Sequence, residues 1–175
     1  MAGTTTNYAW TYPTSTDLVK DGATAIQTLA TAQDTSLYNK IWGASRVLAA
    51  DNNYSNQTTY ADMSNAADKT ALDLSVIKKQ TSSVLLVTMS MPVSFTSGAG
   101  QNMYAAINIA GTDYAIAIQN FATSPVRSYI SGSRIITGIS AATLACKPRF
   151  AAAGASAVTL VSGNIVSYTV QELAQ

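Results

Sequence analysis

The sequence contains no histidine and only one cysteine among its 175 residues. The absence of histidine excludes Ser-His-Asp and Cys-His catalytic arrangements and zinc sites of the Cys/His type. The single thiol, Cys146, cannot form a disulfide within the chain. Its neighbours alternate as in a strand, which predicts a buried, inert thiol. The glycine-rich phosphate loops of nucleotide-binding proteins are also missing. We therefore expect no enzyme activity, no metal and no cofactor.

Charged residues are scarce as well. They make up 11% of the chain, whereas an average soluble domain has about 25%. The formal net charge is +1, so no field steers the protein toward nucleic acid or anionic lipid. A weakly charged surface resists aggregation poorly unless partners cover part of it. The composition therefore favours an oligomer and argues against nucleic acid as a partner.

Long hydrophobic runs are the third absence. No stretch approaches the ~20 apolar residues of a membrane-spanning helix, because Thr88, Ser90 and Pro92 interrupt the longest one. The N-terminal residues MAGTTTNYAW have neither the basic nor the apolar region of a secretory signal. We expect a soluble protein, made in a cytoplasm and without membrane insertion.

The first residues that stand out are aromatic. Tyr8, Trp10 and Tyr12 alternate along the chain and would share one face of an extended arm. Pro13 restricts Tyr12 to an extended or turn conformation. These four residues can pack on the body of the protein or on a partner. We interpret them as the residues that anchor the protein to a larger particle.

A short amphipathic segment follows the arm. Its largely apolar stripe recurs at helical spacing and consists of Ile26, Leu29, Ala30, Gln33 and Leu37. A helix this short is marginal alone. Packed against identical copies it would place Ile26 and Leu29 in the seam, with Gln33 as a polar layer that fixes the register. We interpret the stripe as an oligomerisation site. The alternative is a helix that lies on the domain's own sheet.

After Tyr38 the hydrophobic pattern changes to a period of two, which predicts strands and no further helix. Pro92 predicts a strand edge or a bulge. Short strands at this spacing are typical of a β-sandwich or jelly roll. We therefore predict a mainly β protein, with an extended arm and one helix in residues 1–43 and a jelly-roll-like head in 44–175. The candidate strands are 45–50, 57–62, 70–76, 83–95, 103–109, 114–118, 126–130, 134–139, 142–151, 157–161 and 165–173. The expected core residues are Leu85, Val87, Ile107, Ile109, Ile116, Ile118, Ile136, Val166 and Val170.

The segment DNNYSNQTTY at 51–60 has the composition of a turn. Amide and aromatic side chains on such a loop can bind a sugar by hydrogen bonds and stacking. A solvated turn between two strands is the simpler interpretation. The candidate receptor-binding residues are Asn52, Asn53, Tyr54, Asn56 and Gln57.

The stretch YPTSTDLVKDGATAIQTLATAQDTSL, from Tyr12 to Leu37, resembles a segment common in virion structural proteins of tailed bacteriophages. There a Tyr-Pro-x-x-x-Asp stretch precedes a Lys/Met-Asp-Gly step and an Ala-Ile-x-x-Leu-Ala helix. The matching residues are Tyr12, Pro13, Asp17, Asp21, Gly22, Ile26 and Leu29.

The remainder is similar to the β-sandwich heads, of tumour-necrosis-factor or C1q type, that end phage fibres and decorate heads and tails. The similarity lies in SSVLLVTM, YAAINIAGTDYAIAI and the final SYTVQEL. It implies a homotrimer in the virion, joined to other virion proteins by its N-terminal segment. Two roles remain open: a tail-associated fibre or receptor-binding head that binds a host surface glycan, or a capsid decoration protein. A bacterial lectin-like protein is a more distant alternative.

Overall fold

The computed structural model describes residues 3–4, 11–12, 19–38, 41–55, 57–95, 101–121, 126–153 and 157–173. The chain divides into two compact units, Met1–Lys40 and Ile41–Gln175. Residues 41–43, which the sequence pattern assigned to the arm, are the first residues of a strand in the second unit. None of the helices in the described part of the chain is both long and apolar enough to span a bilayer.

The described residues of the first unit form one helix, α1 (Val19–Tyr38), and two short paired strands. Strands β1 (Gly3–Thr4) and β2 (Thr11–Tyr12) are antiparallel, with Gly3 opposite Tyr12. Helix α1 includes the whole predicted apolar stripe. On this helix Ile26 is 60% exposed, Gln33 is exposed and Leu29 is half-buried. The helix therefore presents an apolar residue to solvent within its own unit.

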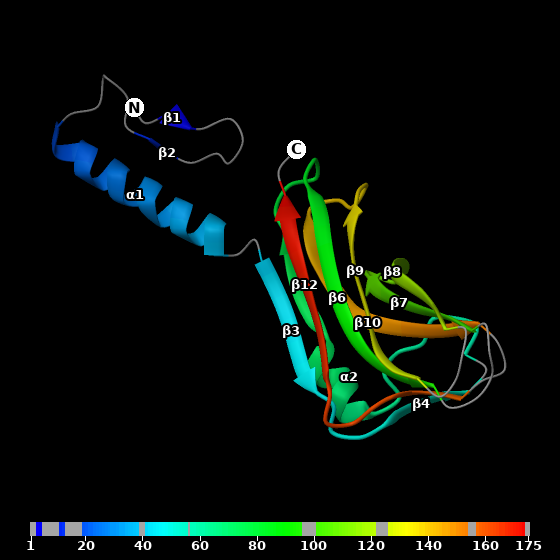
Figure 1. The fold of residues 1–175 in the computed structure, drawn as a ribbon. Helices are drawn as coiled ribbons and strands as arrows, with labels where there is room; N and C mark the ends of the chain where they lie inside the picture. The colour runs from blue at the N-terminus through cyan, green and yellow to red at the C-terminus, as the bar shows by residue number, and fades with distance from the viewer. Residues whose placement is uncertain are drawn as a thin grey trace. The chain divides into compact units, whose positions relative to one another are not determined.

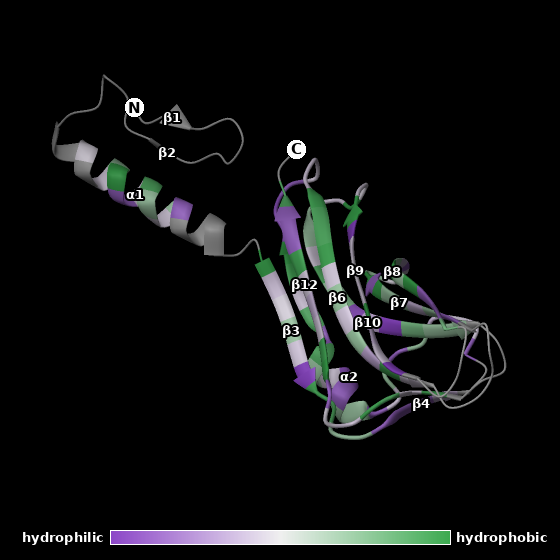
Figure 2. Cartoon of the chain, viewed as in Figure 1, coloured by the Kyte–Doolittle hydropathy of each residue, from purple (hydrophilic) through white to green (hydrophobic). Residues whose placement is uncertain are grey.

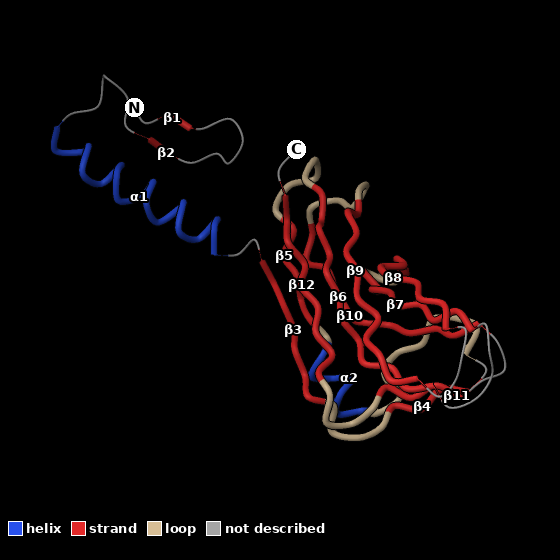
Figure 3. Tube along the Cα trace, in the orientation of Figure 1, coloured by secondary structure: helices blue, strands red, loops and turns tan. Residues whose placement is uncertain are grey.

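The second unit is a sandwich of two antiparallel sheets (Figures 1 and 3). This architecture confirms the predicted mainly β, jelly-roll-like fold. The six-stranded sheet has the order β3-β12-β6-β11-β4, with β9 paired to the other side of β6. Its strands are β3 (Ile41–Val47), β4 (Asn52–Ser55), β6 (Val84–Phe95), β9 (Val126–Ile136), β11 (Ala157–Leu160) and β12 (Ile165–Leu173). The four-stranded sheet has the order β5-β10-β7-β8. Its strands are β5 (Leu74–Lys78), β7 (Gln101–Ile109), β8 (Thr112–Phe121) and β10 (Ala142–Ala153).

Strand β6 is the centre of the six-stranded sheet. It pairs with β9 along one side, while β12 and then β11 share its other side. The pairing with β12 includes Ser90, and the pairing with β11 begins at Ser94. Pro92 pairs with Tyr129 of β9, but on its other side it lies between the pairings with β12 and β11. The prediction of a strand edge or a bulge at Pro92 is therefore wrong for β6 as a whole, which is a central strand, although one side of the strand is unpaired at the proline, which lacks an N–H.

The core lies between the two sheets, and eight of the nine predicted core residues are buried. Ile118 is the exception, with 63% of its side-chain surface exposed. The strand pairing explains the difference. A bulge between Ala105 and Ala106 places one extra residue in β8. The bulge reverses the alternation after Ile116, so that Ala117 faces the core and Ile118 faces solvent.

A second helix, α2 (Ala66–Leu72), replaces the first three residues of the predicted strand 70–76, and the last three begin β5. Asn65 caps it, since its side chain accepts hydrogen bonds from the N–H groups of Ala67 and Asp68. The prediction of a single helix is therefore wrong. Residues 57–62 are also not a regular strand, although Ala61 makes an isolated bridge to Phe150. The two strands predicted within 126–139 form the single strand β9.

At Gly132, strand β9 lies close against β8 of the other sheet. A Cβ atom at this position would lie 2.8 Å from the carbonyl oxygen of Ile116 and 2.9 Å from the Cβ of Ala117. We expect Gly132→Ala to lower the free energy of unfolding by about 1–3 kcal/mol, because a backbone must shift to make room. Urea unfolding measures the effect, with Ser133→Ala, an exposed neighbour on the same strand, as the control. Equal midpoints for the two variants would contradict the prediction.

Candidate functional site: an uncharged face of the six-stranded sheet

The outward side chains of β3, β12, β6 and β9 form rows across the sheet, because the strand registers place them side by side. Two adjacent rows carry only glycine, serine and threonine, and we call them the hydroxyl face. The first row is Gly43, Thr169, Thr88 and Ser133. The second row is Ser45, Ser167, Ser90 and Ser131.

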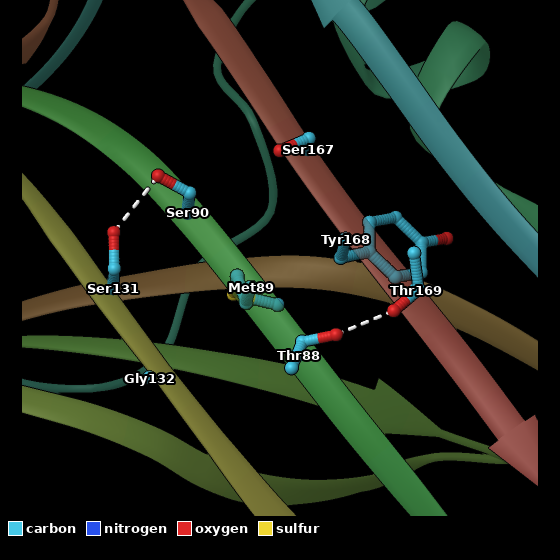
Figure 4. Close-up of a pocket in the computed structure, with 8 residues that line it drawn as sticks. All are labelled: Thr88, Met89, Ser90, Ser131, Gly132, Ser167, Tyr168 and Thr169. Atoms are coloured by element: carbon cyan, nitrogen blue, oxygen red, sulfur yellow. Dashed lines mark hydrogen bonds between the residues drawn. The ribbon is translucent and has the colours of Figure 1, made fainter.

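The hydroxyl face contains a shallow depression of about 280 Å³ over β6, β9 and β12 (Figure 4). Four of its hydroxyl groups are hydrogen-bonded to one another in two pairs. The Oγ1 atoms of Thr88 and Thr169 lie 2.5 Å apart, and the Oγ atoms of Ser90 and Ser131 lie 2.9 Å apart. A partner that covered these groups would leave few hydrogen bonds unsatisfied. The face is therefore suited to burial.

Rows that are apolar except for Gln171 flank the hydroxyl face on both sides. On one side the row is Ile41, Gln171, Leu86 and Ile135, and on the other side lie Val47, Ile165 and Tyr129. Five of these apolar side chains are between 47% and 58% exposed. No charged residue occurs in any of the four rows, and Figure 2 shows β3 nearly neutral in hydropathy along most of its length. An exposed surface of this kind is typical of a protein interface.

The structure corrects the predicted receptor loop. Asn52 and Tyr54 lie in β4, and they are 0% and 6% exposed. Asn52 donates a hydrogen bond to Asp68 Oδ2 at 3.1 Å, and the ring of Tyr54 packs on Phe150 at 5.2 Å between centroids. The expectation of a solvated loop is therefore wrong for Asn52 and Tyr54. Both residues instead tie β4 to the core.

The other predicted site residues are not brought together. Asn53 is exposed and Gln57 is half-buried, so a receptor role for these two stays a prediction. Asn56, Tyr8, Trp10 and Pro13 lie outside the described residues, and Tyr12 is the last residue of β2. Their anchoring role also stays a prediction. Leu37 lies in the last turn of α1, and the oligomerisation role of this helix remains to be tested.

An ion-pair network fastens residues 57–63 to the four-stranded sheet. Asp62 contacts Lys69 at 2.8 Å, Lys147 at 2.9 Å and Arg149 at 2.9 Å. Arg149 also reaches Asp113 at 2.8 Å. Burial acts to raise the pKa of Asp62, but hydrogen bonds from Lys69 and Lys147 outweigh it and lower this pKa to about 2. Asp62 is therefore a permanently charged structural group.

Lys78 and Ser83 form a buried pair of the residue types found in serine–lysine catalytic dyads, but their surroundings indicate a structural role. The Nζ atom of Lys78 lies 2.9 Å from Ser83 Oγ, and burial lowers the pKa of Lys78. However, Lys78 and Ser83 are 2% and 3% exposed. Glu172 accepts hydrogen bonds from the N–H groups of Lys79 and Gln80 at 3.0 and 2.9 Å. The cluster therefore stabilises the turn that connects β5 to β6.

No known protein family model matches the sequence. No curated protein matches it either. Solved structures with a similar fold include the VP2 subviral particle of infectious bursal disease virus, at 16% identity and a TM-score of 0.44. The match covers 77% of this chain but only 38% of the VP2 chain.

Two further similar structures are single β-sandwich domains. One is the Eiger TNF of S. frugiperda, at 13% identity and a TM-score of 0.45, covering 78% of this chain and 94% of that one. The other is the globular domain of the zebrafish complement 1qA protein, at 11% identity and a TM-score of 0.38, covering 78% of this chain and 98% of that one.

Proposed function

We propose that this chain is a homotrimeric structural protein of a bacteriophage virion, whose β-sandwich forms a tail-associated fibre tip or receptor-binding head. Its role is adhesive and structural, without catalysis. The observation that carries the proposal is the uncharged hydroxyl face with its apolar flanks. The N-terminal segment that resembles those of phage structural proteins supports the placement in a virion.

The size of the hydroxyl face and its flanks suggests a role in assembly. Four strands at ~4.8 Å and seven residues at ~3.4 Å give a flat area of about 450 Å². A stable interface buries about 800 Å² per partner. The sheet therefore supplies only part of the interface between copies, and a second contact surface is needed.

Helix α1 provides the second contact in this proposal. Its exposed Ile26 and half-buried Leu29 belong to one stripe, which would pack against the same stripe of sister chains. The face requires a closed assembly of copies, and the resemblance to trimeric heads favours three. Three weak receptor sites on one trimer would then act together through their high effective concentration.

Cryo-electron microscopy of intact particles tests the proposal. Trimers at the tail would support a fibre or receptor-binding head. Copies spread over the shell would instead identify a capsid decoration protein. Absence of the protein from particles would overturn the virion assignment altogether.

A further inference from the structure

A second groove lies on the outer face of the four-stranded sheet, over β5, β10 and β7. Its volume is about 530 Å³, within the roughly 300–1,000 Å³ of small-molecule sites. The core separates this groove from the hydroxyl face, so it stays open when that face is covered. The lining residues whose side chains matter here are Asp73, Ser75, Asn108, Thr143, Ala145 and Lys147.

The register explains why a hollow forms here. Ser75 lies opposite Ala145 on the neighbouring strand, and Thr143 precedes Ala145 by two residues on the same face of β10. Because the side chain of Ala145 is short, the surface is lower there than at the neighbouring hydroxyl groups of Ser75 and Thr143. Asp73, the residue that ends α2, adds a carboxylate at the rim.

The polar groups in this groove differ from those of the hydroxyl face in one respect. Within the described residues, the carboxylate of Asp73 and the hydroxyls of Ser75 and Thr143 make no hydrogen bond. Three exposed groups therefore converge on one hollow without satisfying one another: a carboxylate that accepts hydrogen bonds and two hydroxyls that both donate and accept them. A ligand can form hydrogen bonds with these groups without breaking hydrogen bonds that stabilise the fold.

The charge at the groove selects among ligands. Lys147 forms an ion pair with Asp62 at 2.9 Å. The ion pair offsets the charge of Lys147, and the ammonium group keeps further N–H donors for a ligand. Asn108 is engaged with Asp113 at 2.6 Å and with the N–H of Gly111 at 3.1 Å. The carboxylate of Asp73 has no such ion-pair partner within 4 Å among the described residues. The groove therefore disfavours anions and suits a neutral ligand rich in hydroxyls.

We infer that this groove binds a neutral hexose unit of a saccharide. The carboxylate of Asp73 accepts hydrogen bonds from two adjacent sugar hydroxyls, the hydroxyls of Ser75 and Thr143 complete the contact, and Lys147 donates to a sugar oxygen. As a receptor site this inference rests on the proposed function. Binding of a single hexose does not, since the groove belongs entirely to one chain.

Amide NMR titration of the intact protein tests the inference. The probes are methyl α-glucopyranoside, methyl β-galactopyranoside, N-acetylglucosamine, and the anionic glucose 6-phosphate. We expect at least one neutral probe to shift the amides of Ser75, Thr143 and Ala145, with saturation in the millimolar range. Asp73→Asn should weaken this binding about tenfold, through loss of a charged acceptor. Ser133→Ala, on the opposite sheet, should leave it unchanged, and glucose 6-phosphate should bind more weakly.

Three results would overturn the inference. They are an absence of shifts with every neutral probe, shifts centred on Asn53 and Gln57 instead, and equal binding by Asp73→Asn. The same titration on a chain with lysine substituted at Thr88 and Ser90 separates the two proposals. Local sugar binding combined with an unchanged oligomer in that variant would refute the assembly face and retain the groove.

Discussion

Substitution of both Thr88 and Ser90 by lysine is expected to convert the proposed trimer into monomers. The two residues are adjacent outward positions of β6, the central strand of the hydroxyl face. Each chain would then present two ammonium groups to a surface that offers them no carboxylate. An unpaired buried charge costs several kcal/mol, and every ~1.4 kcal/mol weakens association tenfold. Size-exclusion chromatography with light scattering at micromolar protein should therefore show the mass of one chain.

A matched variant controls for the added charge. Lysines at Ser75 and Thr143 add the same two charges to the outer face of the four-stranded sheet, and this variant should keep the mass of the wild type. Aspartates at Ile26 and Leu29 test the contribution of helix α1 separately. A folded Thr88/Ser90 variant with the wild-type mass would show that the face is not the interface. Monomers from the helix variant alone would assign assembly to α1.

The strands that the sequence predicts well are those in which large apolar residues alternate strictly with small polar ones. In β6 the buried Val87, Met89 and Met91 alternate with the small polar Thr88 and Ser90. The sequence also predicts the hairpin between β7 and β8. In the structure Ala110 and Gly111 turn the chain there, with φ values of 49° and 92°. Such local signals need no knowledge of distant residues.

Predictions failed where one local pattern fits two structures. Leu72, Leu74 and Val76 alternate as in a strand, but Leu72 reaches the core from the end of α2 and Val76 reaches it from β5. The cap at Asn65 and the acidic Asp68 in the first turn favour the helix. The period-two pattern therefore predicted one strand where the structure has the end of a helix followed directly by a strand.

The candidate sites depend on neighbours that are distant in sequence. Thr88 and Thr169 are 81 positions apart, yet their hydroxyls touch. The alternation of each strand predicts an outward polar side chain, but only the register between strands shows that these side chains form one uncharged face. Asn52 was misassigned for the same reason: its turn-like neighbours are local, whereas its partner Asp68 lies 16 residues away.

The substitution Asp68→Asn is expected to lower the free energy of unfolding by about 2–4 kcal/mol near neutral pH. Asp68 is 0% exposed. Its Oδ1 accepts hydrogen bonds from Arg46 at 3.1 Å and from the N–H of Ala49 at 3.0 Å, and its Oδ2 accepts one from Asn52 at 3.1 Å. An amide would turn a donor toward at least one of these donors and leave Arg46 without its counter-charge. Urea unfolding measures the loss.

The dependence on pH distinguishes this charge network from simple packing. Burial acts to raise the pKa of Asp68, but hydrogen bonds from Ala49, Asn52 and Arg46 outweigh it and leave the pKa below its ordinary value. A carboxyl whose pKa is lowered on folding stabilises the protein above its unfolded pKa, and this stability is lost as the pH falls through the folded value. The gap between the wild type and Asp68→Asn should therefore narrow as the pH falls below the ordinary aspartate pKa of about 4.

The control for this experiment is Asp73→Asn, because Asp73 is exposed and its carboxylate makes no hydrogen bond within the described residues. Its effect on stability should stay within about 0.5 kcal/mol. A gap for Asp68→Asn that is as large in acid as at neutral pH would mean that the amide disturbs packing. An effect as small as that of Asp73→Asn would mean that Asp68 does not hold α2 to strands β3 and β4, and the buried network would then lose its structural role.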